Sequence, residues 1–321
     1  MAAKGKAVIL ITHKMHEVMQ IADRITVLRG GKAVYNSPRM GTTEPILTRM
    51  MVGQEVILHQ TKLTKHTYGQ EIIKLENVSA LNDKGLLGIK DITLSLREGE
   101  ILGIAGVAGN GQKELAEVVA GIRKVVNGDI SIVDERLTGA KPKAFIEAGI
   151  SLIPEDRLGM GLVPALGSVD NALLKNYRSA QWGRFFLSPK LIKNNAALLI
   201  NKFGVKTPSL ATPVRMMSGG NLQRLLLARE ISGKPKLIIA VYPVRGLDIK
   251  ATDEVHKLLL GQRMAGCAII LISEDLEELL AMSDVISVLY NGKIAGTVTH
   301  DEATPEKLAG LMTGQKKEVS A

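Results

Sequence analysis

Short apolar runs alternate with segments of helical spacing along most of the chain. The runs with the length and composition of buried strands lie at residues 72–78, 92–96, 100–105, 149–153, 236–241, 268–272 and 285–290. A helical segment begins near Gln112, and the pattern is helical again between about 156 and 229, where several prolines interrupt it. Strands that alternate with helices predict an α/β fold with a mainly parallel sheet, and the middle segment predicts an inserted helical subdomain.

An internal repeat links the two ends of the chain. The segment that starts at Ala7, AVILITHKMHEVMQIADRITVLRGGK, aligns without a gap with AIILISEDLEELLAMSDVISVLYNGK, which starts at Ala268, so the copies lie 261 residues apart. In both copies an apolar strand ends at Ser or Thr, a helix follows, and a second strand leads to a Gly-Lys hairpin turn. Two complete copies would need roughly 520 residues.

The repeat sets the expected domain organisation. We expect residues 1–56 to be the C-terminal tail of a first copy and residues 57–70, which lack apolar periodicity, to be a linker. Residues 71–315 would then be the second copy, with its helical subdomain at about 156–229.

Composition and charge change this picture little. The chain is 45% hydrophobic and 23% charged, as in ordinary globular proteins. A net charge of +9 would suit nucleic acid or an anionic membrane surface, but the Lys and Arg residues are scattered, which favours solvated faces. The single cysteine, Cys267, excludes an internal disulfide. No run reaches the roughly 18 apolar residues that a membrane span needs, and the N-terminus lacks a signal-peptide pattern.

The stretch GVAGNGQKEL, from Gly106 to Leu115, is close to a phosphate-binding loop. The pattern G-x-x-x-x-G-K-[ST] has its outer glycines at Gly106 and Gly111, but Gln112 stands where the lysine should be and Lys113 where the hydroxyl should be. Backbone N–H groups and a helix N-terminus hold the phosphates in such loops. The stretch therefore predicts a phosphate cradle without its cation, and a plain strand-to-helix turn is the alternative.

Two further motifs lie downstream. Ser218, Gly219, Gly220 and Asn221 open a helical segment, where a hydroxyl and bare N–H groups suit an anion, or where the residues simply cap the helix. The apolar run at 236–241 is followed by YPVRGLD. The joint occurrence of the loop, the Ser-Gly-Gly helix and this strand and turn is more specific than any one of them.

In this order the motifs resemble the nucleotide-binding domains of ABC transporters. They are similar to the second domain of the two-domain ATP-binding subunits of bacterial importers for simple sugars and nucleosides, on the segments GEILGIAGVAGNGQ (99–112), IPEDRLGMGLV (153–163), SGGNLQ (218–223), LARE (227–230) and RGLD (245–248). The resemblance implies a P-loop NTPase-like fold, ATP as cofactor, and Mg²⁺ only in the complete assembly.

The resemblance implies nucleotide-binding roles for a set of residues, but several of these residues differ in type from those usual in the family. The matching positions are Gly106, Gly109, Asn110, Gly111, Gln112, Lys113, Glu114, Glu155, Ser218, Gly219, Gly220, Asn221, Asp248 and Glu274. Several of them depart from the family: Gln112 replaces the Walker A lysine, Lys113 and Glu114 the hydroxyls, Glu155 the Q-loop glutamine, and Glu274 the histidine that touches the γ-phosphate. Val241 and Tyr242 replace the Walker B aspartate and the glutamate that polarises water. We expect no metal ligands here, and hydrolysis at this loop to be absent or very slow.

The retained residues belong to a different site. In this family each ATP lies between the loop of one domain and the signature helix of the other. Ser218, Gly219 and Gly220 would therefore face the loop of the first domain, with His13 as the catalytic histidine of that composite site and Asp248 projecting across the interface. A structural role for His13 at a strand end is the alternative.

The resemblance also implies partners and a location. These are membrane-spanning permease subunits docked near residues 161–177, a substrate-binding protein reached indirectly, a partner nucleotide-binding domain, and no nucleic acid. The chain would be cytoplasmic, on the inner face of the cell membrane, and alone it would hydrolyse ATP negligibly. Two other functions stay open: a soluble ABC-type protein acting on nucleic acid or ribosomes, which the charge of +9 supports, and a regulatory or relic protein that does not couple nucleotide to transport.

Overall fold

The chain divides into two compact units. A computed structural model describes residues 1, 4–12, 15–29, 31–52, 67–183 and 187–314. One unit comprises Met1–Lys62 with Leu247–Asp253, and the other comprises Leu63–Gly246 with Glu254–Ala321.

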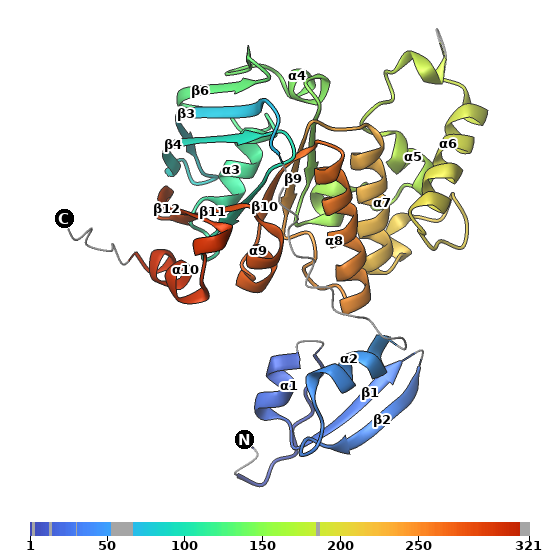
Figure 1. Cartoon of the computed structure of the whole chain (residues 1–321). Coiled ribbons are helices and arrows are strands. Elements are labelled where there is room, and N and C mark those ends of the chain that lie inside the picture. Colours follow the sequence, from blue (N-terminus) through green and yellow to red (C-terminus); the bar gives the residue numbers. More distant parts are fainter. Residues whose placement is uncertain (2–3, 13–14, 30, 53–66, 184–186, 315–321) are drawn as a thin grey trace, which may run out of the picture. The chain divides into compact units, whose positions relative to one another are not determined.

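The smaller unit consists of a β-hairpin and two short helices that pack on each other, drawn in blue in Figure 1. Its elements are α1 (Met15–Ile21), β1 (Arg24–Arg29), β2 (Lys32–Pro38) and α2 (Glu44–Val52). β1 and β2 pair antiparallel. Ile25 and Val27 face the same side of β1, because the side chains of successive strand residues point to opposite sides. With Leu47 of α2 they form the buried core of this unit.

The repeat is visible in both copies with one exception. At an offset of 261 residues, α1, β1 and β2 coincide with α9 (Leu276–Met282), β11 (Val285–Tyr290) and β12 (Lys293–Thr299). The prediction of an apolar strand that ends at Thr12 is wrong. Residues 7–12 form no strand, and the side chains of Ile9 and Ile11 are 90% and 93% exposed.

The reason is the lack of neighbouring strands. The aligned strand of the second copy, β10 (Ala268–Ile272), lies between β5 (Ile101–Ala105) and β9 (Leu237–Val241) and pairs with both. No strand among the described residues pairs with residues 7–12. An apolar run without hydrogen-bonding partners on either side does not form a strand.

The larger unit is built on a six-stranded sheet of order β12-β11-β5-β10-β9-β8, where β8 is Ile150–Ile153. All neighbours pair parallel except β11 and β12, which form an antiparallel hairpin. β5, β9 and β10 are buried along their whole length. This confirms the expected α/β fold with a mainly parallel core, since parallel strands covered on both faces read as continuous apolar runs.

A second sheet was not expected. It is antiparallel, in the order β4-β3-β6-β7, with β3 at Glu71–Leu81, β4 at Leu87–Arg97, β6 at Asn127–Ile132 and β7 at Glu135–Arg136. The runs at 72–78 and 92–96 are indeed strands, but a turn of five residues joins them. A connection that short allows only antiparallel pairing, whereas a parallel pair needs a crossover of a dozen or more residues.

Helices complete the larger unit and place its loops. The remaining helices are α3 (Gln112–Val119), α4 (Pro142–Glu147), α5 (Ser168–Leu173), α6 (Pro189–Lys202), α7 (Gly219–Ser232), α8 (Ile249–Met264), which belongs to the larger unit from Glu254 on, and α10 (Pro305–Met312). α3 packs between the two sheets, with Leu115, Val118 and Val119 in the core. α5, α6 and α7 pack on one another, and α7 lies beside α8 (Figure 1), with Arg224 Nε donating to Glu254 at 2.9 Å.

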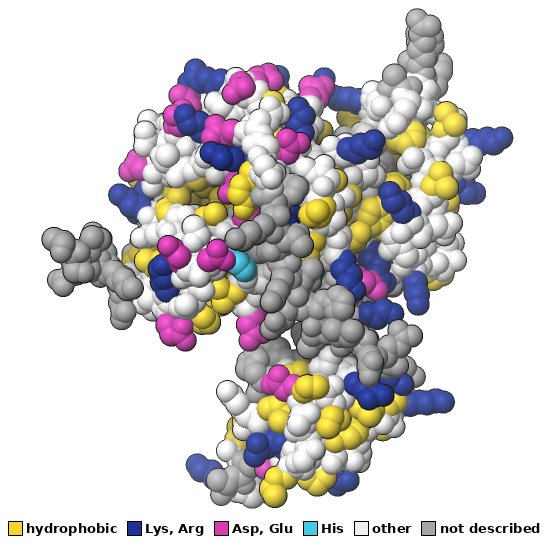
Figure 2. All heavy atoms as spheres, viewed as in Figure 1, with side chains coloured by type: hydrophobic (Ala, Val, Ile, Leu, Met, Phe, Trp, Pro, Cys, Tyr) yellow, Lys and Arg dark blue, Asp and Glu magenta, His cyan; other side chains and the backbone are white. Residues whose placement is uncertain are grey.

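The surface carries charge of both signs. Figure 2 shows Lys and Arg side chains scattered among Asp and Glu on one face of the larger unit. No helix among the described residues combines the length and apolar character that crossing a bilayer requires. Cys267 is buried, and burial raises the pKa of its thiol to about 12, so the thiol stays protonated at neutral pH.

Candidate functional site

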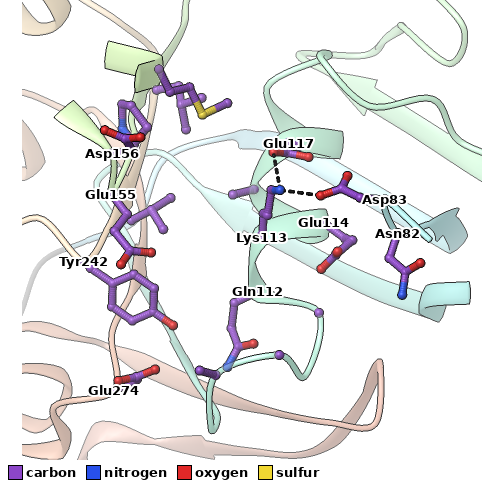
Figure 3. Close-up of a pocket in the computed structure, with 18 of the residues that line it drawn as sticks. Asn82, Asp83, Gln112, Lys113, Glu114, Glu117, Glu155, Asp156, Tyr242 and Glu274 are labelled. Carbon is purple, nitrogen blue, oxygen red and sulfur yellow. Dashed lines mark hydrogen bonds and ion pairs between the residues drawn. The ribbon is translucent and has the colours of Figure 1, made fainter. Parts of the chain in front are cut away.

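A cavity of about 470 Å³ lies beside the loop that joins β5 to α3 (Figure 3). The loop side of its lining is formed by Gly109, Gly111, Gln112, Lys113 and Glu114. The opposite side is formed by residues that follow β8, β9 and β10, among them Glu155, Tyr242 and Glu274. The cavity thus lies at the carboxyl ends of parallel strands, where α/β folds bind ligands.

The loop of residues 106–111 is fastened to the neighbouring strands. Gly111 has a φ of 110°, and a β-carbon there would lie 2.7 Å from Gly88 O. Only glycine allows both this backbone conformation and so close an approach to β4. Asn110 accepts hydrogen bonds from the turn between β11 and β12, at 2.7 Å from Asn291 N and 3.0 Å from Gly292 N.

The side chain of Gln112 fills the inner side of this loop. Its Nε2 donates to Val107 O at 3.0 Å, and its Oε1 accepts from Asn110 N at 3.1 Å. Gln112 is 3% exposed, and its Nε2 lies 2.5 Å from where a β-carbon on Gly106 would be. The amide therefore satisfies a backbone donor and a backbone acceptor of the loop from within.

Lys113 is directed away from the loop. Its Nζ lies 2.6 Å from Asp83 Oδ2 and 3.9 Å from Glu117, as the dashed lines in Figure 3 show. Asp83 belongs to the turn between β3 and β4 and also pairs with Arg123 Nη2 at 2.6 Å. Hydrogen bonds from Lys113 and Arg123 lower the pKa of Asp83 to about 2, because both stabilise its charged form.

This arrangement predicts how Asp83 titrates. In a carbon-detected NMR titration from pH 6 to pH 3, the Asp83 carboxyl should stay ionised throughout. In Lys113→Met its midpoint should move up toward the ordinary value of 3.8, because the largest stabilising hydrogen bond is lost. Lys84→Met, in the same exposed turn, is the control and should leave the titration unchanged. An unchanged midpoint in Lys113→Met would contradict the assigned pair.

Tyr242 is held in an unusual backbone conformation at the far side of the cavity. Its φ is 46°, which is strained for a side chain other than glycine, and its N–H donates to Ile272 O at 2.8 Å. Burial raises the pKa of Tyr242 to about 12, and the nearby Glu274 and Glu155 carboxylates add to this effect. The phenol is therefore neutral at physiological pH. Glu155 itself forms an ion pair with Arg245.

These residues do not fit a magnesium nucleotide. Gln112 is neutral and bonded within the loop, and Lys113 is paired with Asp83. Val241, at the end of β9, offers no ligand to a metal. Within the ranges that the structure describes, His, Cys, Asp and Glu side chains form no group of three or more that could hold a metal ion. Phosphoryl transfer needs a cation at the phosphates, and two of the three basic side chains in the described lining, Lys113 and Arg245, are already paired with carboxylates.

The Ser-Gly-Gly segment lies at the N-terminus of α7, outside the cavity lining. Ser218 is the N-cap, and its side chain makes no capping bond to the helix. Asn221 Nδ2 donates to Ser218 Oγ at 2.9 Å, while Asn221 Oδ1 accepts from Lys206 N at 2.8 Å. The first N–H groups of this 14-residue helix, from Gly219 and Gly220, are thus free to hold an anion.

The remaining predicted residues lie elsewhere. Asp248 is exposed and accepts from Ala251 N at 2.8 Å, at the start of α8. His13 lies outside the described residues. Gly106 and Asn110 belong to the loop without lining the cavity. The structure therefore brings together the loop, Glu155 and Glu274, and leaves the α7 residues outside this group.

Sequence reasoning missed part of the lining. Asn82 and Asp83 come from the turn between β3 and β4, and Met160 from a π-helical turn at Arg157–Gly161. Nothing in a polar turn such as Asn-Asp-Lys-Gly points to a cavity. The motif that contains Arg157 does not indicate a role for it, yet Arg157 joins α7 to the turn after β9, with Nε 2.7 Å from Gln223 Oε1 and Nη2 2.6 Å from Arg245 O.

The chain is similar in sequence to proteins of known family. A sequence profile described as ABC transporter matches residues 89–240. The chain is 39% identical to the glucose import ATP-binding protein TsgD13 of Haloferax volcanii, covering 97% of this chain and 57% of that protein. It is 38% identical to the guanosine import ATP-binding protein NupO of Bacillus subtilis, covering 97% and 61%. It is 36% identical to the ribose import ATP-binding protein RbsA of Oceanobacillus iheyensis, also covering 97% and 61%.

The chain thus spans about three fifths of the length of the curated relatives it matches. Among solved structures, a dimeric bacterial ABC transporter cassette superposes with a TM-score of 0.62 at 20% identity, covering 71% of this chain and 99% of that one. An ADP-bound conformation of another ATP-binding cassette superposes with a TM-score of 0.60 at 16% identity, covering 76% and 96%. At these identities the superpositions show a shared fold.

Proposed function

The chain belongs to the ABC transporter family, and from this premise we propose that it forms part of the ATP-binding, energy-coupling component of an importer for nucleosides or simple sugars. The relatives that match 97% of the chain are import ATP-binding proteins for glucose, guanosine and ribose. This chain spans less than two thirds of the length of those relatives. We therefore propose, by similarity, that it shares their kind of cargo, activity and partners.

One observation carries the proposal. The larger unit has two candidate anion-binding elements, the loop before α3 and the N-terminus of α7, and only the second has all the residues that the resemblance implies. The loop before α3 has Gln112 where a phosphate loop has lysine, whereas α7 has Ser218, Gly219 and Gly220 at a helix N-terminus without a side-chain cap. We therefore assign the three α7 residues to a nucleotide held by the loop of another cassette. His13 and Asp248 would complete that composite site, which would hold ATP and Mg²⁺.

The repeat supports the same assignment for the smaller unit. Its helix and two strands coincide with the last elements of the second cassette at a constant offset. Residues 1–56 would thus be the end of a first cassette. The apolar residues 8–11 would then become a sheet strand, as β10 is in the second cassette, once strands of that first cassette pair with them.

The helical part of the larger unit offers a surface for permease subunits. Apolar side chains are exposed along this segment at Val163, Leu166, Leu174 and Tyr177. Apolar patches of this kind mark protein–protein contacts. The permease would place the chain on the inner face of the membrane, and a substrate-binding protein would act on it only through the permease.

A reconstitution experiment tests the proposal. The purified chain alone should show no Mg²⁺-dependent ATPase activity above background. Combined with permease subunits and a cassette that carries an intact phosphate loop, it should support ATPase activity, and Gly220→Asp should lower that activity by about a hundredfold, because a carboxylate then meets the phosphate. Gly233→Asp, at the other end of α7 with open space around it, is the matched control.

One result of the ATPase measurement would contradict the composite site. Rapid Mg²⁺-dependent hydrolysis by the chain alone, abolished by Gly109→Asp in the loop, would mean that the loop of the larger unit is itself a working site. The composite assignment would then be wrong.

A further inference from the structure

The inner side of the loop at residues 106–111, where a phosphate group would lie, is filled by the side chain of Gln112. Gln112 bonds both Val107 O and Asn110 N on the inner side of the loop, and its amide lies against Gly106. A phosphate could occupy the loop only by breaking both bonds. Lys113 and Arg245 would not compensate, because each is already held by a carboxylate, Asp83 and Glu155 respectively.

The charge of the lining also opposes a polyanion. Six carboxylates line the cavity, against three basic side chains, Lys84, Lys113 and Arg245. Two of the three are paired, Lys113 with Asp83 and Arg245 with Glu155. A triphosphate would bring further negative charge within a few ångströms of the remaining carboxylates, and like charges at that separation repel.

The N-terminus of α3 does not reverse this balance. The first N–H groups of a helix attract anions. However, Glu114 stands in the first turn of α3 and supplies a negative charge at that end. It also lines the cavity, so an anionic ligand would meet its carboxylate.

The same lining suits an uncharged ligand that carries hydroxyl groups. No Lys or Arg side chain of the described residues forms an ion pair with Glu114 or Glu274, and Glu274 lies beside the Tyr242 phenol. The remaining oxygens of both carboxylates can accept hydrogen bonds, as acidic residues do from ribose in dinucleotide sites. Leu152, Pro154 and the half-buried ring of Tyr242 add an apolar wall for a flat group. A volume of about 470 Å³ is within the range of small-molecule sites.

We propose that this cavity binds a nucleoside without phosphates, with its sugar hydroxyls on Glu114 at the loop side and its base against Tyr242 and Glu274 at the opposite side, and that it does not bind a nucleoside triphosphate. The proposal goes beyond the import function and stands on the cavity alone. A nucleoside bound there would act as a regulatory ligand, because the lining has no group suited to phosphoryl transfer.

Calorimetric titration of the full chain tests this. Adenosine should bind saturably with a Kd below about 1 mM, whereas Mg-ATP and spermidine should give no saturable signal over the same concentrations. Glu274→Gln should weaken adenosine binding about tenfold or more, since a hydrogen bond to a charged acceptor becomes one to a neutral amide. Glu277→Gln, an exposed carboxylate at the start of α9 that does not line the cavity, should leave binding unchanged.

Three results would overturn the proposal. These are Mg-ATP binding that is tighter than adenosine binding and is lost in Gly109→Asp, spermidine binding in preference to adenosine, and no adenosine binding at about 10 mM, a concentration far above typical small-ligand Kd values. The titration uses the chain alone, and the reconstituted ATPase activity depends on Gly220, so this proposal and the proposed function can fail separately.

Discussion

Gly111→Val is expected to lower the free energy of unfolding of the larger unit by about 3 kcal/mol or more. Two causes add at this position. The backbone φ of 110° is one that a β-branched residue adopts only with strain, and the new β-carbon would lie 2.7 Å from Gly88 O and 2.9 Å from Ile89 Cγ2. Both atoms belong to β4, which is part of a packed sheet and cannot move away cheaply. Guanidinium unfolding followed by circular dichroism measures the loss.

A glycine two residues earlier separates these two causes. Gly109 also has a positive φ, of 88°, but a β-carbon there would meet no atom within 4 Å. Gly109→Ala should therefore cost only about 1 kcal/mol, from backbone strain. Equal losses in Gly109→Ala and Gly111→Val would show that packing of the loop on β4 contributes nothing, contrary to the structure.

The loop shows what the sequence could predict. Its glycines stand at positions where the backbone needs them, and the apolar run before it and the helix after it follow from periodicity alone. The same holds for β9, β10 and β11, whose bounds agree with the expected strands to within one residue. Buried parallel strands carry their own signal, because both faces are apolar.

Residues 7–12 show where that signal fails. Their sequence is as apolar as that of β10, yet they form no strand. Strand formation depends on partners far away in the sequence, and a local pattern contains no information about whether those partners are present. The second sheet was missed for a related reason: pairing direction depended on the short turn after Leu81, which the apolar runs do not reveal.

The candidate site shows the same limit at the level of side chains. Spacing identified Gln112 and Lys113 as replacements for the lysine and hydroxyl of a phosphate loop, but it could not say where either side chain points. Gln112 turns inward because the loop offers it a donor and an acceptor. Lys113 turns outward because Asp83, thirty residues earlier, lies within 2.6 Å of it. Only the tertiary arrangement decides both directions.

A buried ion pair gives the other large expected effect. Lys175, which follows α5, donates to Ile150 O at 2.9 Å, to Ser151 Oγ at 2.7 Å and to Glu230 Oε2 at 2.7 Å. It thereby joins the helical part of the larger unit to β8 and α7. Glu230 is 3% exposed. Lys175→Met keeps most of the volume but leaves the buried carboxylate with Arg229, at 2.7 Å, as its one ion-pair partner among the described residues, and should cost about 3 kcal/mol at pH 7.

The dependence of this loss on pH distinguishes charge from packing. Burial acts to raise the pKa of Glu230, but Lys175 and Arg229 outweigh it, so the net pKa lies below the ordinary value of 4.5. A depressed folded-state pKa means that the carboxylate stabilises the fold above pH 4.5 and that this contribution is lost as the pH falls through the folded-state value. In Lys175→Met the pKa of Glu230 should rise, because only Arg229 then offsets the effect of burial. The difference in unfolding free energy between the variant and the unmodified chain should therefore be largest at neutral pH and shrink toward pH 4.

Urea unfolding at pH 7 and pH 4 provides the measurement, and an exposed pair provides the control. Lys143 lies 3.4 Å from Glu147, with both side chains 65% exposed, so Lys143→Met should change the unfolding free energy by less than about 0.5 kcal/mol at either pH. If Lys175→Met were equally destabilising at both pH values, the loss would come from packing and the uncharged hydrogen bonds to Ile150 and Ser151. A loss that disappears at pH 4 would instead assign it to the Glu230 carboxylate, because protonation removes the charge that Lys175 compensates.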